Sequence, residues 1–271
     1  MRVAVALIAL ALAGCGNAPA TPSISGGGIV STNPCADQLL LALAPRGRIA
    51  AISHYSQEAS ATSIPLDVAR SFRGTAGTAE EVIALRPDLV LASSFTPAAT
   101  LRAYQTLGLK VLLLDSPTTI AASRDQIRQV AAALSEKAAG ERLIARIDAA
   151  VAAAAPHDAA RPKALLFISD NFANGGPTLL TEMLGHAGFA TDGKATASGA
   201  IPIERVMRWP PDVILDPDLD GRTATLRRRV LKRAGVRVAE AAFPRSLINC
   251  GGPTIILAMR RLAEIRAGMT R

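Results

Sequence analysis

Two stretches of the chain repeat one pattern of polar and apolar positions. Residues 78–94 and 201–217 each open with a short amphipathic run that carries a glutamate in its first turn. A Pro-Asp pair and then a continuous apolar run follow in both stretches. Glu80 corresponds to Glu204, and the two Pro-Asp pairs keep the same offset. A period close to half the chain predicts two similar lobes, because solenoid repeats are only about 20–50 residues long.

The first copy has the features of a helix followed by a buried strand. Thr78 is placed to cap a helix with Glu81 three residues later, and residues 82–85 supply an apolar stripe. Arg86 precedes a proline, so we expect it to be extended and to end the helix. The apolar run 89–92 is typical of a parallel strand that is buried on both faces.

The rest of the chain alternates short Val/Leu/Ile runs with alanine-rich helical stretches, which predicts an α/β fold with parallel sheets. Residues 118–156 differ, because their apolar positions keep helical spacing throughout. We predict one long connecting helix there, which Gly140 breaks or merely weakens. The expected organisation is an N-terminal lobe at 29–117 and a C-terminal lobe at 157–271, both Rossmann-like and joined by this helix.

The N-terminus has the pattern of a secretory signal. A charged Met-Arg start is followed by a short apolar run, too short to span a bilayer. Residues 1–15 end in Leu-Ala-Gly-Cys, which resembles the bacterial lipobox and marks Cys15 for lipidation. The alternative is an ordinary cleavage site with an incidental cysteine. Residues 16–28 are small and polar, as in a flexible tether. We therefore expect a periplasmic protein that is lipid-anchored to a membrane.

Composition and charge exclude fewer functions than the pattern of polar and apolar positions does. The chain has 271 residues, of which 49% are hydrophobic, so it can bury a large core. Its net charge is +8, but the arginines are scattered over helix faces apart from one cluster at 227–233. No nucleic-acid-reading motif accompanies this charge, so we expect no nucleic-acid partner. We expect a monomer.

Two further cysteines stand near predicted helix starts at opposite ends of the chain. Cys35 follows Asn-Pro, and Cys250 precedes Gly-Gly-Pro. In an oxidising compartment such a pair is often a disulfide, and we favour that interpretation. Two free buried thiols and direct ligand contact stay open, because the distance between the Cα atoms decides the matter.

Taken together, these motifs resemble a known family. The lipobox, the paired glutamate and Pro-Asp units and the mid-chain helix are similar to substrate-binding proteins of ABC importers for cobalamin, iron-siderophores and haem. The resemblance covers roughly residues 28–267. Residues 52–57 and 253–258 are most similar to the cobalamin-binding type. The resemblance implies a ligand cleft between two lobes and no resident cofactor, although a transported ligand would contain cobalt or iron.

The resemblance also implies a docking role for two residues. In that family one glutamate on each lobe pairs with arginines of the permease dimer, and Glu80 and Glu204 match those positions. Two equal charges at a fixed separation would set the register on a two-fold partner. Otherwise both are ordinary first-turn glutamates that the helix dipole favours.

Candidate ligand contacts follow from the expected sheets. Loops at the carboxyl ends of parallel strands line the ligand sites of α/β folds. Aromatic rings there offer flat surfaces for a corrin or porphyrin, although each ring has core packing as its alternative. The predicted ligand-binding residues are Tyr55, Ser94, Phe95, Thr96, Asn171, Phe172, Phe243 and Asn249.

Capture of a bulky chelate, a corrinoid such as cobalamin first and a ferric siderophore or haem next, is the function we expect. A binding protein for free Zn²⁺ or Mn²⁺ is a further alternative, but the chain has only three histidines to offer. We predict no metal site and no catalysis, since neither a Gly-x-Ser-x-Gly elbow nor a phosphate-binding glycine loop is present. Cys35 with His54 is a conceivable nucleophile and base that nothing in the sequence orients.

Overall fold

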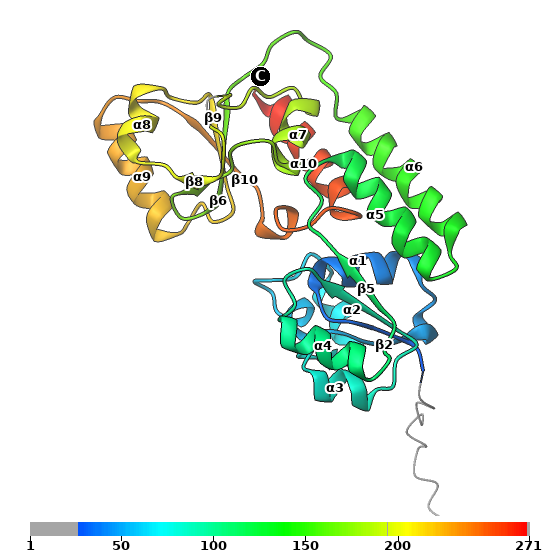
Figure 1. The fold of residues 1–271 in the computed structure, drawn as a ribbon. Coiled ribbons are helices and arrows are strands. Elements are labelled where there is room, and N and C mark those ends of the chain that lie inside the picture. Colours follow the sequence, from blue (N-terminus) through cyan, green and yellow to red (C-terminus); the bar gives the residue numbers. More distant parts are fainter. Residues whose placement is uncertain (1–26, 194, 270–271) are drawn as a thin grey trace, which may run out of the picture.

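The computed structural model describes residues 27–193 and 195–269, which form two α/β lobes (Figure 1). Each lobe contains a five-stranded sheet, with strand orders β3-β2-β1-β4-β5 and β10-β9-β6-β7-β8. All pairs in the first sheet are parallel, whereas β7 and β8 pair antiparallel in the second. The predicted two-lobe α/β class is confirmed. Cys15 and most of the predicted tether lie outside the described residues.

The N-terminal lobe alternates strands and helices. Its elements are β1 (Ile29–Ser31), α1 (Pro34–Leu43), η1 (Arg46–Arg48), β2 (Ile49–Ser53), η2 (His54–Gln57), α2 (Leu66–Arg70), β3 (Gly74–Thr75), α3 (Ala79–Ala84), β4 (Leu89–Ser93), α4 (Ala98–Thr106) and β5 (Val111–Leu114).

After the connecting helices, the C-terminal lobe also alternates strands and helices, except that β7 directly follows β6. Its elements are β6 (Ala164–Ser169), β7 (Phe172–Ala173), α7 (Leu179–His186), β8 (Gly199–Ala200), α8 (Ile203–Arg208), β9 (Val213–Asp216), α9 (Arg222–Arg233), β10 (Ala239–Ala242), η3 (Arg245–Leu247) and α10 (Thr254–Gly268). Among the described helices none is long and apolar enough to cross a bilayer.

The connecting segment is two helices rather than the one long helix predicted. α5 (Ile120–Ala133) and α6 (Lys137–Ala153) pack against each other beside the lobes (Figure 1). The break falls at Ser135, which adopts a left-handed φ of 62°, and not at Gly140. Gly140 lies inside α6, where a Cβ atom would come within 2.6 Å of the Ala131 methyl group. The glycine therefore permits close contact between the two helices instead of interrupting one.

The repeat seen in the sequence corresponds to one repeated backbone clamp. Asp88 accepts a hydrogen bond from the Gly28 backbone N–H at 2.7 Å, just before β1. Asp212 accepts from the Lys163 N–H, also at 2.7 Å, just before β6. In both copies the aspartate N–H returns a bond to the same residue's carbonyl, at 2.8 and 2.9 Å. The prediction that Arg86 is extended is wrong. Arg86 follows α3 with a left-handed φ of 46°.

The core joins the lobes to the connecting helices. One cluster of buried side chains draws on α1, α5, α6, α7 and α10 together with one face of each sheet. Two smaller clusters cover the outer faces, one under α3 and α4 and the other under α8 and α9. A disulfide links Cys35 at the start of α1 to Cys250 just before α10, with Cα atoms 5.3 Å apart. The structure thus pairs the two cysteines in the way that the sequence favoured.

Candidate ligand site and docking surface

The N-terminal lobe places its predicted ligand residues at the carboxyl ends of β2 and β4. Tyr55 lies in η2 directly after β2 and is 50% exposed. Phe95 follows β4 and is 80% exposed, in a turn that the Ser93 hydroxyl stabilises by accepting the Phe95 N–H at 3.1 Å. Ser94 is exposed beside it, and Thr96 is half-buried. Two exposed aromatic residues therefore follow the carboxyl ends of β2 and β4, which flank β1 in the sheet.

His54 stands next to Tyr55 with a defined tautomer. Its Nδ1 lies 3.1 Å from the Thr75 carbonyl oxygen, which can only accept, so Nδ1 carries the proton. In the neutral imidazole the lone pair is then on Nε2. The centroids of the His54 and Tyr55 rings are 4.0 Å apart. This corner of the lobe offers a phenol and an imidazole nitrogen side by side.

In the C-terminal lobe, the turn after β6 presents Asn171, and Phe172 begins β7. Both are exposed, Phe172 to 42%, and the Asn171 carbonyl accepts the Ile201 N–H at 2.9 Å. Asn249 is also exposed, directly before the disulfide. Among the described residues, no hydrogen bond or ring contact joins this set to Tyr55 or Phe95.

Phe243 is a correction to the predicted ligand set. Its ring is only 1% exposed and belongs to the main core, so it has no surface to offer a ligand. The cause is local, because the Phe243 N–H donates to the Asp216 carbonyl at 2.9 Å and continues the ladder one residue past β10. The Phe243 side chain therefore packs into the main core.

Sequence reasoning missed a buried ion pair behind the same loops. Arg227 of α9 pairs with Asp216 at the end of β9, and both side chains are almost fully buried. The guanidinium carbon also lies 4.2 Å from the centroid of the Phe167 ring. Thr223 and Arg227 both hydrogen-bond to Asp170, which has a φ of 34°. The sequence did contain a signal for this pair. Arg227 lies at helical spacing from the apolar Ala224 and Leu231, which places it on the buried face of α9, unlike the neighbouring arginines.

A second buried carboxyl group lies at the opposite lobe's strand ends. Asp37 of α1 is completely buried and accepts hydrogen bonds from the Ser56 hydroxyl at 2.6 Å and the Ser53 N–H at 3.1 Å. Burial raises the pKa of Asp37 to about 7, although hydrogen bonds from Ser31, Ser56 and Ser53 act in the opposite direction. The group therefore changes charge near neutral pH.

The two predicted docking residues are both exposed in the first turn of their helices. Glu80 lies in α3 and Glu204 in α8. These helices occupy matching positions on the outer faces of the two lobes (Figure 1). Both glutamates are therefore accessible to a partner protein, as the predicted docking role requires.

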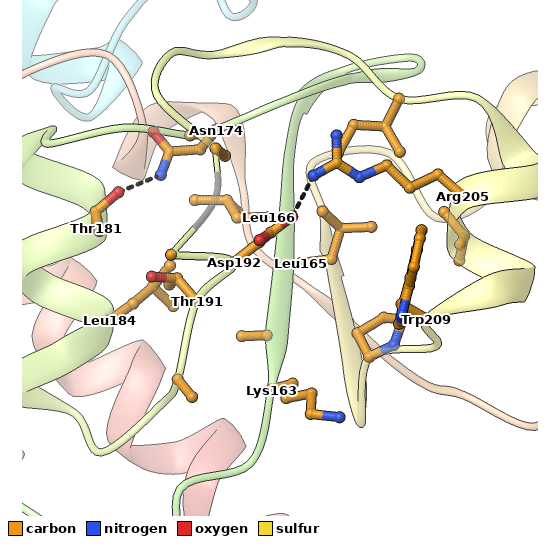
Figure 2. A pocket seen from close by; sticks show the side chains of 18 of the residues that line it. Lys163, Leu165, Leu166, Asn174, Thr181, Leu184, Thr191, Asp192, Arg205 and Trp209 are labelled. Atoms are coloured by element: carbon orange, nitrogen blue, oxygen red, sulfur yellow. Dashed lines mark hydrogen bonds and ion pairs between the residues drawn. The ribbon is translucent and has the colours of Figure 1, made fainter.

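A pocket of about 1100 Å³ lies within the C-terminal lobe, beside the first half of β6 (Figure 2). Leu165, Leu166 and Trp209 form apolar walls, and an ion pair between Arg205 and Asp192 crosses the space. A second hollow of about 540 Å³ lies at the amino ends of the N-terminal strands. Neither contains a predicted ligand residue, although Glu204 lines the first. Within the described part of the chain, no group of three His, Cys, Asp or Glu residues is arranged to hold a metal ion.

The comparison with protein families decides the classification. A family model described as periplasmic binding protein matches residues 29–249. The chain belongs to the periplasmic binding protein family. No curated protein matches it. Members of this family bind haem, vitamin B12 or siderophores outside the cytoplasm for import by ABC transporters.

Solved structures share this periplasmic binding protein fold over nearly the whole chain. The periplasmic haem-binding protein RhuT of Roseiflexus sp. RS-1 is 22% identical with a TM-score of 0.73, covering 91% of this chain and 100% of its own. HutB of Vibrio cholerae, also haem-binding, is 17% identical with a TM-score of 0.71, covering 89% and 98%. The vitamin B12 binding protein BtuF of Vibrio cholerae is 17% identical with a TM-score of 0.67, covering 90% and 97%. At these identities the likeness establishes the fold.

Proposed function

We propose that this chain captures a corrinoid such as cobalamin between its lobes and delivers it to an ABC importer, without catalysing a reaction on it. The observation that carries the proposal is the exposure of Tyr55, Phe95 and Phe172 at strand carboxyl ends of both lobes. The chain has only six phenylalanines and two tyrosines, so three exposed rings at these ends are a marked concentration. Flat rings of this kind suit the face of a planar macrocycle.

The location agrees with the general rule for such folds. Ligands of open α/β sheets bind outside the carboxyl ends of the strands, and the three rings stand there. The two hollows within the lobes lie toward the opposite ends of the strands. The solved vitamin B12 binding protein BtuF has the same fold, which supports the choice of cargo class.

Haem is the second candidate, favoured by one specific observation. The Tyr55 phenol and the Nε2 lone pair of His54 stand beside each other, and both are known types of haem-iron ligand. Several solved relatives of the same fold are haem-binding proteins. A corrinoid needs the ring faces, whereas haem would also use one of these two donor atoms.

Tyr55 separates the two candidates. Isothermal titration of the unacylated chain, made with Cys15→Ser, against cyanocobalamin and haemin tests both. Tyr55→Phe keeps the ring face, so cobalamin affinity should stay within about twofold, whereas a phenolate ligand to haem would be lost and its absorption bands would shift. Tyr55→Ala and Phe95→Ala should each lower affinity for the true cargo by roughly tenfold.

Trp209 supplies a matched control, because it is 65% exposed but lies on the pocket wall in α8's C-terminal region. Trp209→Ala should leave cargo affinity unchanged. If neither cyanocobalamin nor haemin binds the parent chain, the tetrapyrrole assignment is wrong. If Trp209→Ala weakens binding as much as Phe95→Ala, the cargo site is misplaced.

We further propose that Glu80 and Glu204 dock the loaded chain on the permease dimer, as the matched exposure of α3 and α8 supports. A Glu80→Gln/Glu204→Gln double variant should bind cargo as the parent does and fail in cellular uptake. Glu58→Gln/Glu141→Gln changes the same net charge at exposed sites elsewhere and should transport normally. Normal uptake by the first double variant would refute the docking role.

A further inference from the structure

Helix α9 presents two opposite faces with different roles. Its buried positions, Ala224, Arg227 and Leu231, follow helical spacing and point at the sheet. At 100° per residue the diametrically opposite ridge consists of Arg222, Leu226, Arg229 and Arg233, with Lys232 beside it. All five are exposed, and Leu226 is 55% exposed. We call these five residues the basic ridge.

The cations of the basic ridge do not contribute to the fold through ion pairs among the described residues. Within residues 27–193 and 195–269, its four cations Arg222, Arg229, Lys232 and Arg233 form no ion pair, whereas Arg227 pairs with Asp216 and Arg228 with Glu240. Arg222 also stands in the first turn, where a positive charge opposes the helix dipole. Helix stability therefore does not explain its presence.

The matching helix of the other lobe carries only one charge on its exposed face, at Arg102. α4 and α9 end in the same way, because Leu109 N–H donates to the Tyr104 carbonyl and Val236 N–H to the Leu231 carbonyl, both at 2.9 Å. Aligned on these caps, the exposed positions of Arg229, Lys232 and Arg233 correspond to Arg102, Gln105 and Thr106. Lys232 and Arg233 thus carry charge at positions where the same fold accepts neutral side chains in the N-terminal lobe, whereas Arg229 has a charged counterpart in Arg102.

The basic ridge shares a side of the molecule with Glu204. Val206 of α8 and Leu231 of α9 belong to one outer cluster on the same face of the second sheet. Figure 1 shows the two helices together on the outer side of the C-terminal lobe. A chain that docks through Glu204, as proposed above, would turn the ridge toward the surface that surrounds the permease.

We propose that the basic ridge binds the phosphate headgroups of an anionic lipid bilayer. Arginine and lysine side chains carry their charge on long apolar stems, so they reach headgroups while the stems and Leu226 contact the interface. The charge complementarity is direct, and it acts only within a Debye length of the membrane. A lipid anchor would keep the domain within that range.

Vesicle co-sedimentation tests the proposal on the unacylated chain made with Cys15→Ser. Binding should occur to phosphatidylcholine vesicles that contain phosphatidylglycerol and be weak to phosphatidylcholine alone, and added salt should release it. The triple variant Arg229→Gln/Lys232→Gln/Arg233→Thr removes three of the four cations of the basic ridge, and at positions 232 and 233 it introduces the side chains that α4 has. It should lower the partition coefficient by at least about tenfold. Leu226→Ala should cause a smaller loss.

The control removes the same charge elsewhere. Lys137, Arg142 and Arg146 are exposed on α6, and the variant with glutamine at all three should bind within about twofold of the parent. Equal losses in both triples would show that net charge alone acts, and no preference for phosphatidylglycerol would overturn the proposal. Full competition by millimolar inorganic phosphate would reveal a small-anion site instead. Cargo titration of the α9 triple, expected to be unchanged, keeps this result separate from the proposed transport function.

Discussion

The two copies of the repeated unit, α3–β4–α4–β5 and α8–β9–α9–β10, keep their backbone clamps and change almost everything else. Asp88 and Asp212 hold the first strand of their lobes through the same pair of hydrogen bonds. Gly108 and Gly235 end α4 and α9 with φ values of 68° and 71°. The residues common to both copies either hydrogen-bond to backbone groups, as the aspartates do, or adopt the positive φ that ends a helix, as the glycines do.

The differences lie in side chains that the clamps leave free. Where β4 has the apolar Ala92, β9 has Asp216, paired with the buried Arg227. The exposed face of α4 is nearly neutral, whereas that of α9 is basic. One architecture therefore supports two chemically distinct lobes.

The largest effect is expected at the buried ion pair. Arg227→Met leaves the Asp216 carboxylate buried without its partner, which should lower the free energy of unfolding by about 3–5 kcal/mol. The double variant Arg227→Met/Asp216→Ala replaces the ion pair with apolar side chains, with alanine at position 216 as at Ala92 of the N-terminal copy, and should recover most of that loss. Urea unfolding measures both, and a double variant no more stable than the single one would contradict the explanation.

Asp37 should make stability depend on pH through the N-terminal lobe. Its pKa is raised from 3.8 to about 7 by burial, so the folded state favours the neutral acid. The contribution is fully present below pH 3.8 and is lost as the pH rises through 7, a fall of up to about 4 kcal/mol. Asp37→Asn should flatten this slope in unfolding experiments at several pH values.

Glu182 is the matched control for Asp37. It occupies the same position of α7, four residues after the N-cap, and accepts the Ile120 N–H at 2.8 Å. Glu182→Gln should retain the pH dependence of the parent chain. If the pH dependence persisted in Asp37→Asn and disappeared in Glu182→Gln, the titrating group would lie in the C-terminal lobe and the prediction for Asp37 would be wrong.

The clamps should be equivalent in the two copies. Asp88→Ala and Asp212→Ala each remove a hydrogen bond that a backbone N–H donates to a carboxylate at a solvent-exposed position. Each should cost about 1–2 kcal/mol, and the two losses should agree within about 0.5 kcal/mol. Chemical denaturation of both variants measures the difference, and a large inequality would break the comparison.

The smallest effect is expected at the helix-ending glycines. A methyl group at Gly108 or Gly235 would meet no atom within 4 Å, so only the left-handed backbone is strained. Gly108→Ala and Gly235→Ala should each lower stability by about 1 kcal/mol. Thermal melting of the two variants should give matching shifts; a shift in one alone would show that the caps differ.

Much of the fold could be predicted because the signals were local. The repeated glutamate and Pro-Asp pattern identified both α-to-β units, and Glu80 and Glu204 are exposed as a first-turn residue should be. The disulfide was favoured over two alternatives only through the compartment argument. The sequence could not place Cys35 near Cys250, since that depends on how the last helix packs against the first.

The errors occurred where tertiary packing overrode local preference. Gly140 looked like a helix breaker, but close contact with Ala131 explains the glycine, and Ser135 makes the turn. Phe243 looked like a loop aromatic, but one additional ladder bond turns it into the core. Arg227 looked like part of a surface cluster, whereas its side chain forms a buried pair. The cargo contacts themselves remain a prediction that ligand titration must test.

The single disulfide imposes an order on maturation. Its two cysteines are 215 positions apart in the sequence, so during N-to-C export the first helix reaches the oxidising compartment long before its partner. Until then the chain's one other thiol, at Cys15, is the competitor for Cys35. Attachment of a diacylglyceryl group to the Cys15 sulfur would remove that competitor. If Cys15 is acylated, as the lipobox-like sequence predicts, the modification would protect correct cross-linking as well as provide an anchor.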